Sequence, residues 1–221
     1  MLERYVTALR TDDAGAETPA ETRDRLRDHF ARGATRRMTQ LGMLIGAQVK
    51  AVEPQPHEAL VYLSAYAETR ALEGYLESFP TASPTLFQTS IHPSAIQQVM
   101  IGQHQPLRHF FPMAGSRHGI AQALTVALLG DPAAPTLVCG GEERGTWLLE
   151  QNAASDRTFG FVFRLSANAT NALARVRLSP EVGYPVGTCP LPQFFDTLVA
   201  RRPLTLGAPS GARLTWDWLA P

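Results

Sequence analysis

Residues 107–143 read LRHFFPMAGSRHGIAQALTVALLGDPAAPTLVCGGEE, and this stretch decides the fold. An apolar run at 109–113 predicts a strand, and Ala114-Gly115-Ser116 predicts a tight turn in which Ser116 caps the next helix. Beyond the turn, apolar residues recur three and four positions apart and form one helical face: Ile120, Ala123, Leu124, Ala127 and Leu128. The expected order is therefore strand, tight turn, helix.

The turn aims a side chain at the helix N-terminus, where free N–H groups and the helix dipole stabilise an anion or an oxyanion. Enzymes place nucleophiles at such turns. Met113 occupies this position, or Ala114 if the register shifts by one residue. A thioether has no proton to lose and cannot form an acyl thioester, so nucleophilic chemistry is not expected. Downstream, 135–139 predicts a short buried strand that closes on Gly140-Gly141, where we expect a sharp turn.

The remaining periodicities predict an α/β protein. Residues 35–52, TRRMTQLGMLIGAQVKAV, predict a helix capped by Thr35. Apart from Gln48 this helix is apolar on one face and small and apolar on the other, so it is expected to be buried between other elements. Further helices are expected at 22–31, 68–79, 91–102 and 190–200. Strands are expected at 4–9, 59–65, 156–165, 172–178, 204–206 and 212–218, and a loop at 79–90.

The amino-acid composition limits which classes of protein are expected. The chain has 221 residues, of which 44% are hydrophobic, and this predicts one domain with one sizeable core. Because 20 basic residues balance 20 acidic ones, no nucleic-acid or anionic-membrane surface is expected. Cys139 and Cys189 have neither disulfide-framework nor metal-ligand spacing, so we expect free thiols, no metal and no cofactor. The charged N-terminus and the lack of a long apolar stretch predict a cytoplasmic protein without a membrane span.

Several motifs resemble those of the β-ketoacyl synthases, members of the thiolase-like family. In that family a strand delivers a catalytic cysteine five residues before a position often held by histidine, and a later strand ends in Gly-Gly-x-Glu. Here His118 lies five residues after Met113, and Gly140-Gly141-Glu142-Glu143 occupies the later place. Arg36-Arg37-Met38 resembles the motif that opens a long helix across the ketosynthase core, and the resemblance covers roughly residues 36–166.

The resemblance implies an α/β, thiolase-like fold, equivalent to the N-terminal half of a ketosynthase, with a mixed sheet between helix layers and without the C-terminal half. Residues 1–221 are expected to form a single ketosynthase-like N-terminal domain, with a core at about 36–178 and a short C-terminal extension at 179–221. Ketosynthases take two catalytic histidines from the missing half, and no histidine follows His118 in this sequence. His92 stands in an active-site loop of the family and is interpreted as a structural or capping residue. The chain is therefore not expected to be an enzyme.

Ketosynthase-like proteins without the cysteine include the chain-length factors of type II polyketide systems, and a short group of these occurs in aryl polyene clusters. The sequence looks most like that short group, which implies a pseudoenzyme. Its expected partner is an active β-ketoacyl-ACP synthase, with which it would form a heterodimer. Acyl carrier protein is expected to be only an indirect partner. Ketosynthases pair largely through the strand before the nucleophile, here 109–113. The residues expected at this interface, or in an acyl tunnel across it, are His109, Phe110, Phe111, Met113 and Met100.

Two other interpretations stay open. Gly115-Ser116-Arg117-His118-Gly119 is a near miss to the G-x-S-x-G elbow of α/β hydrolases, which would make Ser116 the nucleophile of an acyl esterase. A hydrolase triad also needs an acid and a histidine later in the chain, and the last histidine is His118. The second interpretation is a structural scaffold subunit without effect on chain length, which the sequence does not separate from a length factor.

Overall fold

The computed structural model describes residues 1–55, 57–104, 107–115, 117–181 and 183–220. Its strands are β1 (Leu2–Asp13), β2 (Ala59–Ser64), β3 (His109–Ala114), β4 (Thr136–Glu142), β5 (Phe159–Ser166), β6 (Ala174–Ser179), β7 (Leu204–Gly207) and β8 (Arg213–Trp218). They form one eight-stranded sheet in the order β3-β2-β4-β5-β1-β6-β8-β7. β2 runs parallel to β3 and β4, and all other pairs are antiparallel, so the sheet is mixed.

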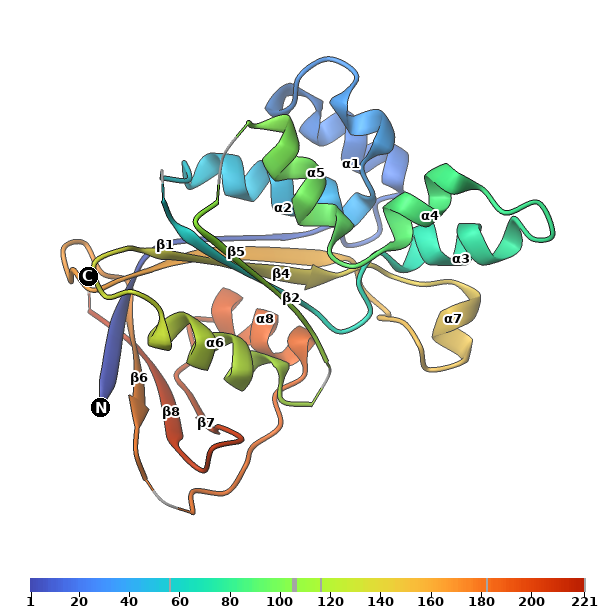
Figure 1. Cartoon of the computed structure of the whole chain (residues 1–221). Coiled ribbons are helices and arrows are strands. Elements are labelled where there is room, and N and C mark those ends of the chain that lie inside the picture. Colours follow the sequence, from blue (N-terminus) through green and yellow to red (C-terminus); the bar gives the residue numbers. More distant parts are fainter. Residues whose placement is uncertain (56, 105–106, 116, 182, 221) are drawn as a thin grey trace.

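Helices cover both faces of this sheet. They are α1 (Pro19–Leu26), α2 (Gln40–Ala51), α3 (Thr69–Glu77), α4 (Pro84–Ser90), α5 (Ser94–Gly102), α6 (Gly119–Leu129), α7 (Trp147–Glu150) and α8 (Leu191–Val199), with two short 3-10 helices, η1 (Arg27–His29) and η2 (Ala34–Arg37). Figure 1 shows α1, α2 and α5 on one face and α6 and α8 on the other, while α3, α4 and α7 gather at one end. The mixed sheet between helix layers confirms the expected α/β architecture.

The sheet divides the core into two hydrophobic clusters. The α2 cluster includes Leu44, Leu60, Tyr62, Met100 and Val162, and the α6 cluster includes Leu63, Leu124, Phe163, Phe194 and Trp216. Because side chains alternate along a strand, β5 sends Val162 to the first cluster and Phe163 to the second. Phe194 of α8 packs edge-on against Trp216 of β8, with ring centroids 5.9 Å apart. The sheet therefore curls toward α8, and β7 and β8 belong to the same core as the central strands.

The expected buried helix is present but begins later than predicted. Every residue of α2 from Gln40 to Val49 is buried, which confirms that both of its faces are covered. Thr39 is the N-cap, and its hydroxyl accepts a hydrogen bond of 3.0 Å from the N–H of Gly42. The predicted cap, Thr35, lies instead in η2. The cap prediction was wrong because Met38 is extended and separates η2 from α2.

Two further predictions from turn residues were wrong. The segment expected to be a loop at 79–90 contains α4, whose N-cap Ser83 accepts a hydrogen bond from the N–H of Leu86. Gly140-Gly141 does not turn the chain but lies within β4, paired with β2 and β5. A Cβ on Gly140 would collide with the carbonyl oxygen of Leu63. These glycines therefore permit close strand packing.

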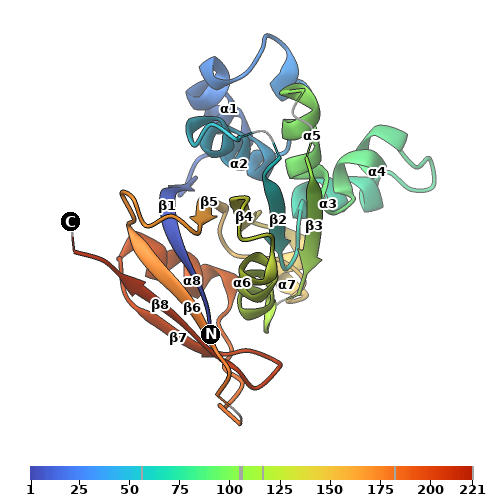
Figure 2. The same ribbon diagram turned by 60° about the vertical axis from the view of Figure 1, so that its left-hand side comes forward.

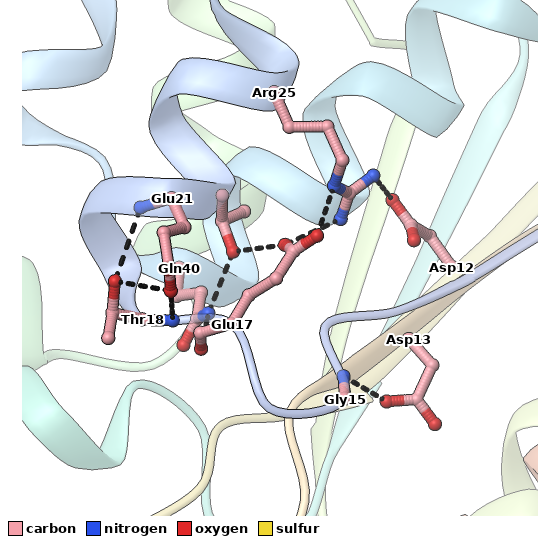
Figure 3. Close-up of polar contacts among 9 residues, drawn as sticks. Asp12, Asp13, Gly15, Glu17, Thr18, Glu21, Arg25 and Gln40 are labelled. Atoms are coloured by element: carbon pink, nitrogen blue, oxygen red, sulfur yellow. Dashed lines mark hydrogen bonds and ion pairs between the residues drawn. The ribbon is translucent and has the colours of Figure 1, made fainter.

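The N-terminal strand is longer and more central than the expected 4–9. β1 pairs with β5 on one side and β6 on the other. Polar contacts dock α1 onto it, as Figure 3 shows. Arg25 forms ion pairs with Asp12 at 2.9 Å and Glu17 at 2.7 Å, and the Gln40 amide donates to the Glu17 carbonyl at 3.0 Å. β1, α1 and α2 are thereby held together. In the described ranges, no helix combines the length and apolar character needed to cross a membrane.

Candidate functional site

The edge strand β3 carries most of the residues predicted for an interface. It pairs with β2 from His109 opposite Ala59 to Ala114 opposite Ser64, and it has no second neighbour among the described strands. Figure 2 shows β3 at the margin of the sheet, beside β2. The Phe111 side chain is 41% exposed. A strand edge with unpaired N–H and C=O groups and an exposed aromatic side chain can pair with another chain.

The five predicted interface or tunnel residues do not gather in one place. Phe110 packs against the α2 cluster, which also contains the buried Met100 of α5. Met113 is half-buried and packs against the α6 cluster on the opposite face. The rings of His109 and Phe111 lie 6.2 Å apart at the exposed edge. β3 therefore presents one edge while its side chains divide between the two faces of the sheet.

The predicted strand and helix are confirmed by β3 and α6, whereas the predicted turn between them includes a residue outside the described ranges and stays a prediction. The N-cap of α6 is His118, whose Nδ1 lies 3.3 Å from the carbonyl oxygen of Gly187, and no described side chain caps the helix. Gly119 lies so close to β2 that a Cβ there would sit 3.0 Å from a methyl of Leu63. Ser116 lies outside the described residues, so its predicted roles as cap or esterase nucleophile stay predictions.

The Glu142 carboxylate joins the carboxyl ends of β2 and β4. It accepts hydrogen bonds from the N–H of Ala65 at 2.6 Å, the N–H of Tyr66 at 3.0 Å and the hydroxyl of Ser64 at 3.0 Å. Burial raises the pKa of Glu142 to about 7, although these three donors oppose the shift. A cavity of about 310 Å³ lies beside it, lined by Ala65, Tyr66 and the start of α8 among others. Among the described residues, none of the five predicted interface positions lines this cavity.

The Glu143 carboxylate holds the beginnings of two helices. It accepts hydrogen bonds of 3.0 Å from the N–H of Gln40 in α2 and from the N–H of Arg70 in α3. Burial raises its pKa to about 7. Two more buried glutamates act alike: Glu68 accepts from the N–H of Ala95 in α5, and Glu73 accepts from the backbone around the start of α7. The Gly-Gly-x-Glu motif is thus part of a structural clamp for helix N-termini.

Sequence reasoning missed Glu68 and Glu73. Both lie in a segment that reads as an ordinary amphipathic helix, and only the fold reveals that they are buried. His92 was interpreted as structural, and its ring stacks on Tyr62 with centroids 5.0 Å apart. Burial lowers the pKa of His92, which favours the neutral ring.

The two cysteines lie away from the turn before α6. Cys139 is in the middle of β4 and Cys189 precedes α8; both are buried free thiols. Burial raises the pKa of both, to about 11 for Cys189. The described residues contain no group of histidine, cysteine, aspartate or glutamate side chains arranged to hold a metal ion.

The curled mixed sheet, its helix layers and the succession of β3 and α6 define a thiolase-like fold of the ketosynthase type. This chain is similar to a chain in the complex of a ketosynthase (ApeO) with its chain length factor (ApeC) from Xenorhabdus doucetiae. The TM-score is 0.66 with 17% sequence identity, and the match covers 98% of this chain and 100% of that chain. The sequence itself matches no protein-family model and no curated protein.

Two further solved structures share the fold. The ishigamide ketosynthase/chain length factor matches with a TM-score of 0.53 and 12% identity over 84% of this chain and 66% of that chain. A β-ketoacyl synthase from Burkholderia phymatum STM815 matches with a TM-score of 0.52 and 14% identity over 84% of this chain and 67% of that chain. This chain thus spans about two thirds of both, but all of the chain from the Xenorhabdus complex.

Proposed function

We propose that this chain is a non-catalytic, chain-length-factor-like subunit that pairs with an active β-ketoacyl-ACP synthase. The observation that carries the proposal is the match over the whole length of a chain from a complex of a ketosynthase with its chain length factor. That match covers 98% of this chain and 100% of the other chain, so the shared fold extends over both compared chains.

The side chains near the turn support a role without catalysis. Met113 stands where the resemblance places the nucleophile, and its thioether cannot carry an acyl group. Cys139 and Cys189 cannot replace it, because both thiols are buried and burial keeps them protonated. The His92 ring stacks on the buried Tyr62. Under this proposal the partner supplies the acylated cysteine and the decarboxylation histidines.

The edge of β3 is the proposed pairing surface. A partner strand there would satisfy the outer N–H and C=O groups of β3 and cover Phe111 and His109. Phe110, Met113 and Met100 lie behind this edge on both sides of the sheet, from where they would shape the end of an acyl tunnel across the interface. We further propose that residues 1–221 act as a single ketosynthase-like domain in a type II polyketide system of the aryl polyene kind.

The test of pairing is co-expression with the ketosynthase encoded beside this chain, purification through a tag on one subunit, and mass determination by light scattering. A stable one-to-one complex is expected. A well-behaved monomer that ignores the ketosynthase would refute the proposal. If the complex forms, product length then separates a length factor from a scaffold, because only a length factor changes the product when Met113 is replaced by Phe.

A point substitution tests the surface. Phe111→Lys should leave folding within about 0.5 kcal/mol, because Phe111 is partly exposed. A lysine buried at an interface centre would cost roughly 2 kcal/mol or more, which is at least a thirtyfold loss of affinity for the ketosynthase. The matched control is Leu129→Lys, at a 66% exposed position on the far end of α6. Equal affinities for both variants would place the interface elsewhere.

A further inference from the structure

A groove of about 920 Å³ opens on the helical face away from α6, between residues 29–38 and the helices α4 and α5. Figures 1 and 2 both show α1, α2 and α5 together on this side of the sheet. The groove is separate from the cavity beside Glu142. Its volume falls within the range of about 300–1,000 Å³ that is typical of small-molecule sites.

The charge in the groove has one sign. Three basic side chains line it, His29, Arg37 and Lys50, and no acidic residue occurs among its described lining. Within the described ranges, neither Arg37 nor Lys50 forms an ion pair. The Lys50 ammonium donates one hydrogen bond, of 3.0 Å, to the carbonyl oxygen of His29. In a chain with balanced charge, this cationic lining complements an anion.

The rest of the lining combines apolar side chains with neutral polar ones, the latter from α4, α5 and the segment after α5: Thr85, Gln88, Thr89, Ser94, Gln97, Gln98 and Gln103. Phe30, Met38 and Val99 form part of the wall and also pack against the α2 cluster. Gly46 of α2 makes this arrangement possible, because a Cβ there would lie 2.8 Å from the Phe30 ring and 2.9 Å from Val99. Ile101, also in the lining, is 73% exposed. The groove thus combines cationic side chains with an uncovered apolar surface, which is the chemistry of an amphiphilic-anion site.

We propose that this groove binds a single-chain fatty carboxylate. The carboxylate would lie between Arg37 and Lys50, and the alkyl chain would run over Phe30, Ile91 and Ile101 toward α4. An exposed guanidinium or ammonium contributes up to about 1 kcal/mol to such a pair, so the apolar wall supplies most of the affinity. This site does not depend on the pairing surface at β3.

The test is titration calorimetry of the full-length chain with dodecanoate below its critical micelle concentration. Dodecanol and dodecyltrimethylammonium, which have the same chain with a neutral or a positive head, serve as comparison ligands. We expect dodecanoate to bind more tightly than either. Arg37→Gln and Lys50→Gln should each weaken dodecanoate binding about three- to fivefold and leave dodecanol unchanged, since one exposed charge pair is lost. Arg202→Gln, an exposed arginine outside the groove, is the matched control.

Ile101→Ser should weaken both dodecanoate and dodecanol, because it removes apolar wall without removing charge. Hydrogen exchange provides a second readout: bound dodecanoate should slow exchange in residues 29–38 and in α5. Equal affinity for all three head groups, protection confined to β3, or no binding at millimolar dodecanoate would each overturn the proposal. Preferential binding of an acidic peptide over dodecanoate at the same residues would overturn it in favour of a protein partner.

Discussion

Replacing Glu143 tests the helix clamp most directly. One oxygen of its carboxylate accepts from the N–H of Gln40, the first residue of α2, and the other accepts from the N–H of Arg70 in the first turn of α3. Loss of a helix cap costs about 1 kcal/mol, and a buried donor left without an acceptor costs about 1–3 kcal/mol. Because Glu143→Ala affects two such donors, we expect a loss of roughly 2–4 kcal/mol in the free energy of unfolding.

The loss of unfolding free energy caused by Glu143→Ala should depend on pH. Burial raises the pKa of Glu143 to about 7, so the folded protein bears a desolvated charge above that pH and a neutral carboxyl below it. Above this pKa the substitution also removes an unfavourable buried charge, which offsets part of the lost stability. Below the pKa there is no charge to remove. The destabilisation by Glu143→Ala should therefore be larger at about pH 6 than at about pH 8.5.

Urea denaturation followed by circular dichroism measures both effects. Glu143→Gln keeps one carbonyl oxygen as acceptor and should lose about half as much stability as the alanine variant. Glu150→Ala, which removes an exposed glutamate of α7, should change stability by less than about 0.5 kcal/mol. If Glu143→Ala at about pH 6 matched Glu150→Ala, or if its cost grew with pH, the clamp argument would fail.

Burial raises the pKa of Glu68 to about 8 from an ordinary 4.5, so the unfolding free energy should fall as the pH rises between these values, by up to roughly 5 kcal/mol. Glu68→Gln, neutral throughout, should reduce the pH dependence of the urea midpoint, and the remainder should come from Glu142 and Glu143. Cys139 and Cys189 should resist iodoacetamide in native buffer and react fully in urea, which intact-mass spectrometry detects. Gly140→Ala places a methyl against the backbone of β2 and should cost about 3 kcal/mol in denaturant titration, whereas Gly102→Ala, in open space, should cost little.

Local pattern was enough to predict most elements from the sequence. Three- and four-residue spacing placed α6 after a strand and a turn, and the doubly apolar pattern of residues 35–52 correctly predicted that α2 is buried. The resemblance in residues 107–143 correctly indicated a thiolase-like fold. The helical patterns depend on residues within one or two turns of each other, so they can be predicted from local sequence without the tertiary structure.

Short helices and caps were less predictable. The prolines and serines of 79–90 suit both a loop and the start of α4, and Thr35 and Thr39 are equally good caps by composition. In the structure Ser83 caps α4, and Thr39 caps α2 because the extended Met38 separates α2 from Thr35.

By itself, the sequence determined the strand and the helix on either side of residues 115–118, the buried character of α2, and the lack of a cysteine at position 113. Only the tertiary structure decided the strand order, the division of Phe110 and Met113 between two faces, and the buried positions of the clamp glutamates. The physical reason is separation along the chain. Gly140 meets Leu63 and Glu143 meets Gln40 only after the sheet has formed, so no local window of sequence contains both partners of either contact.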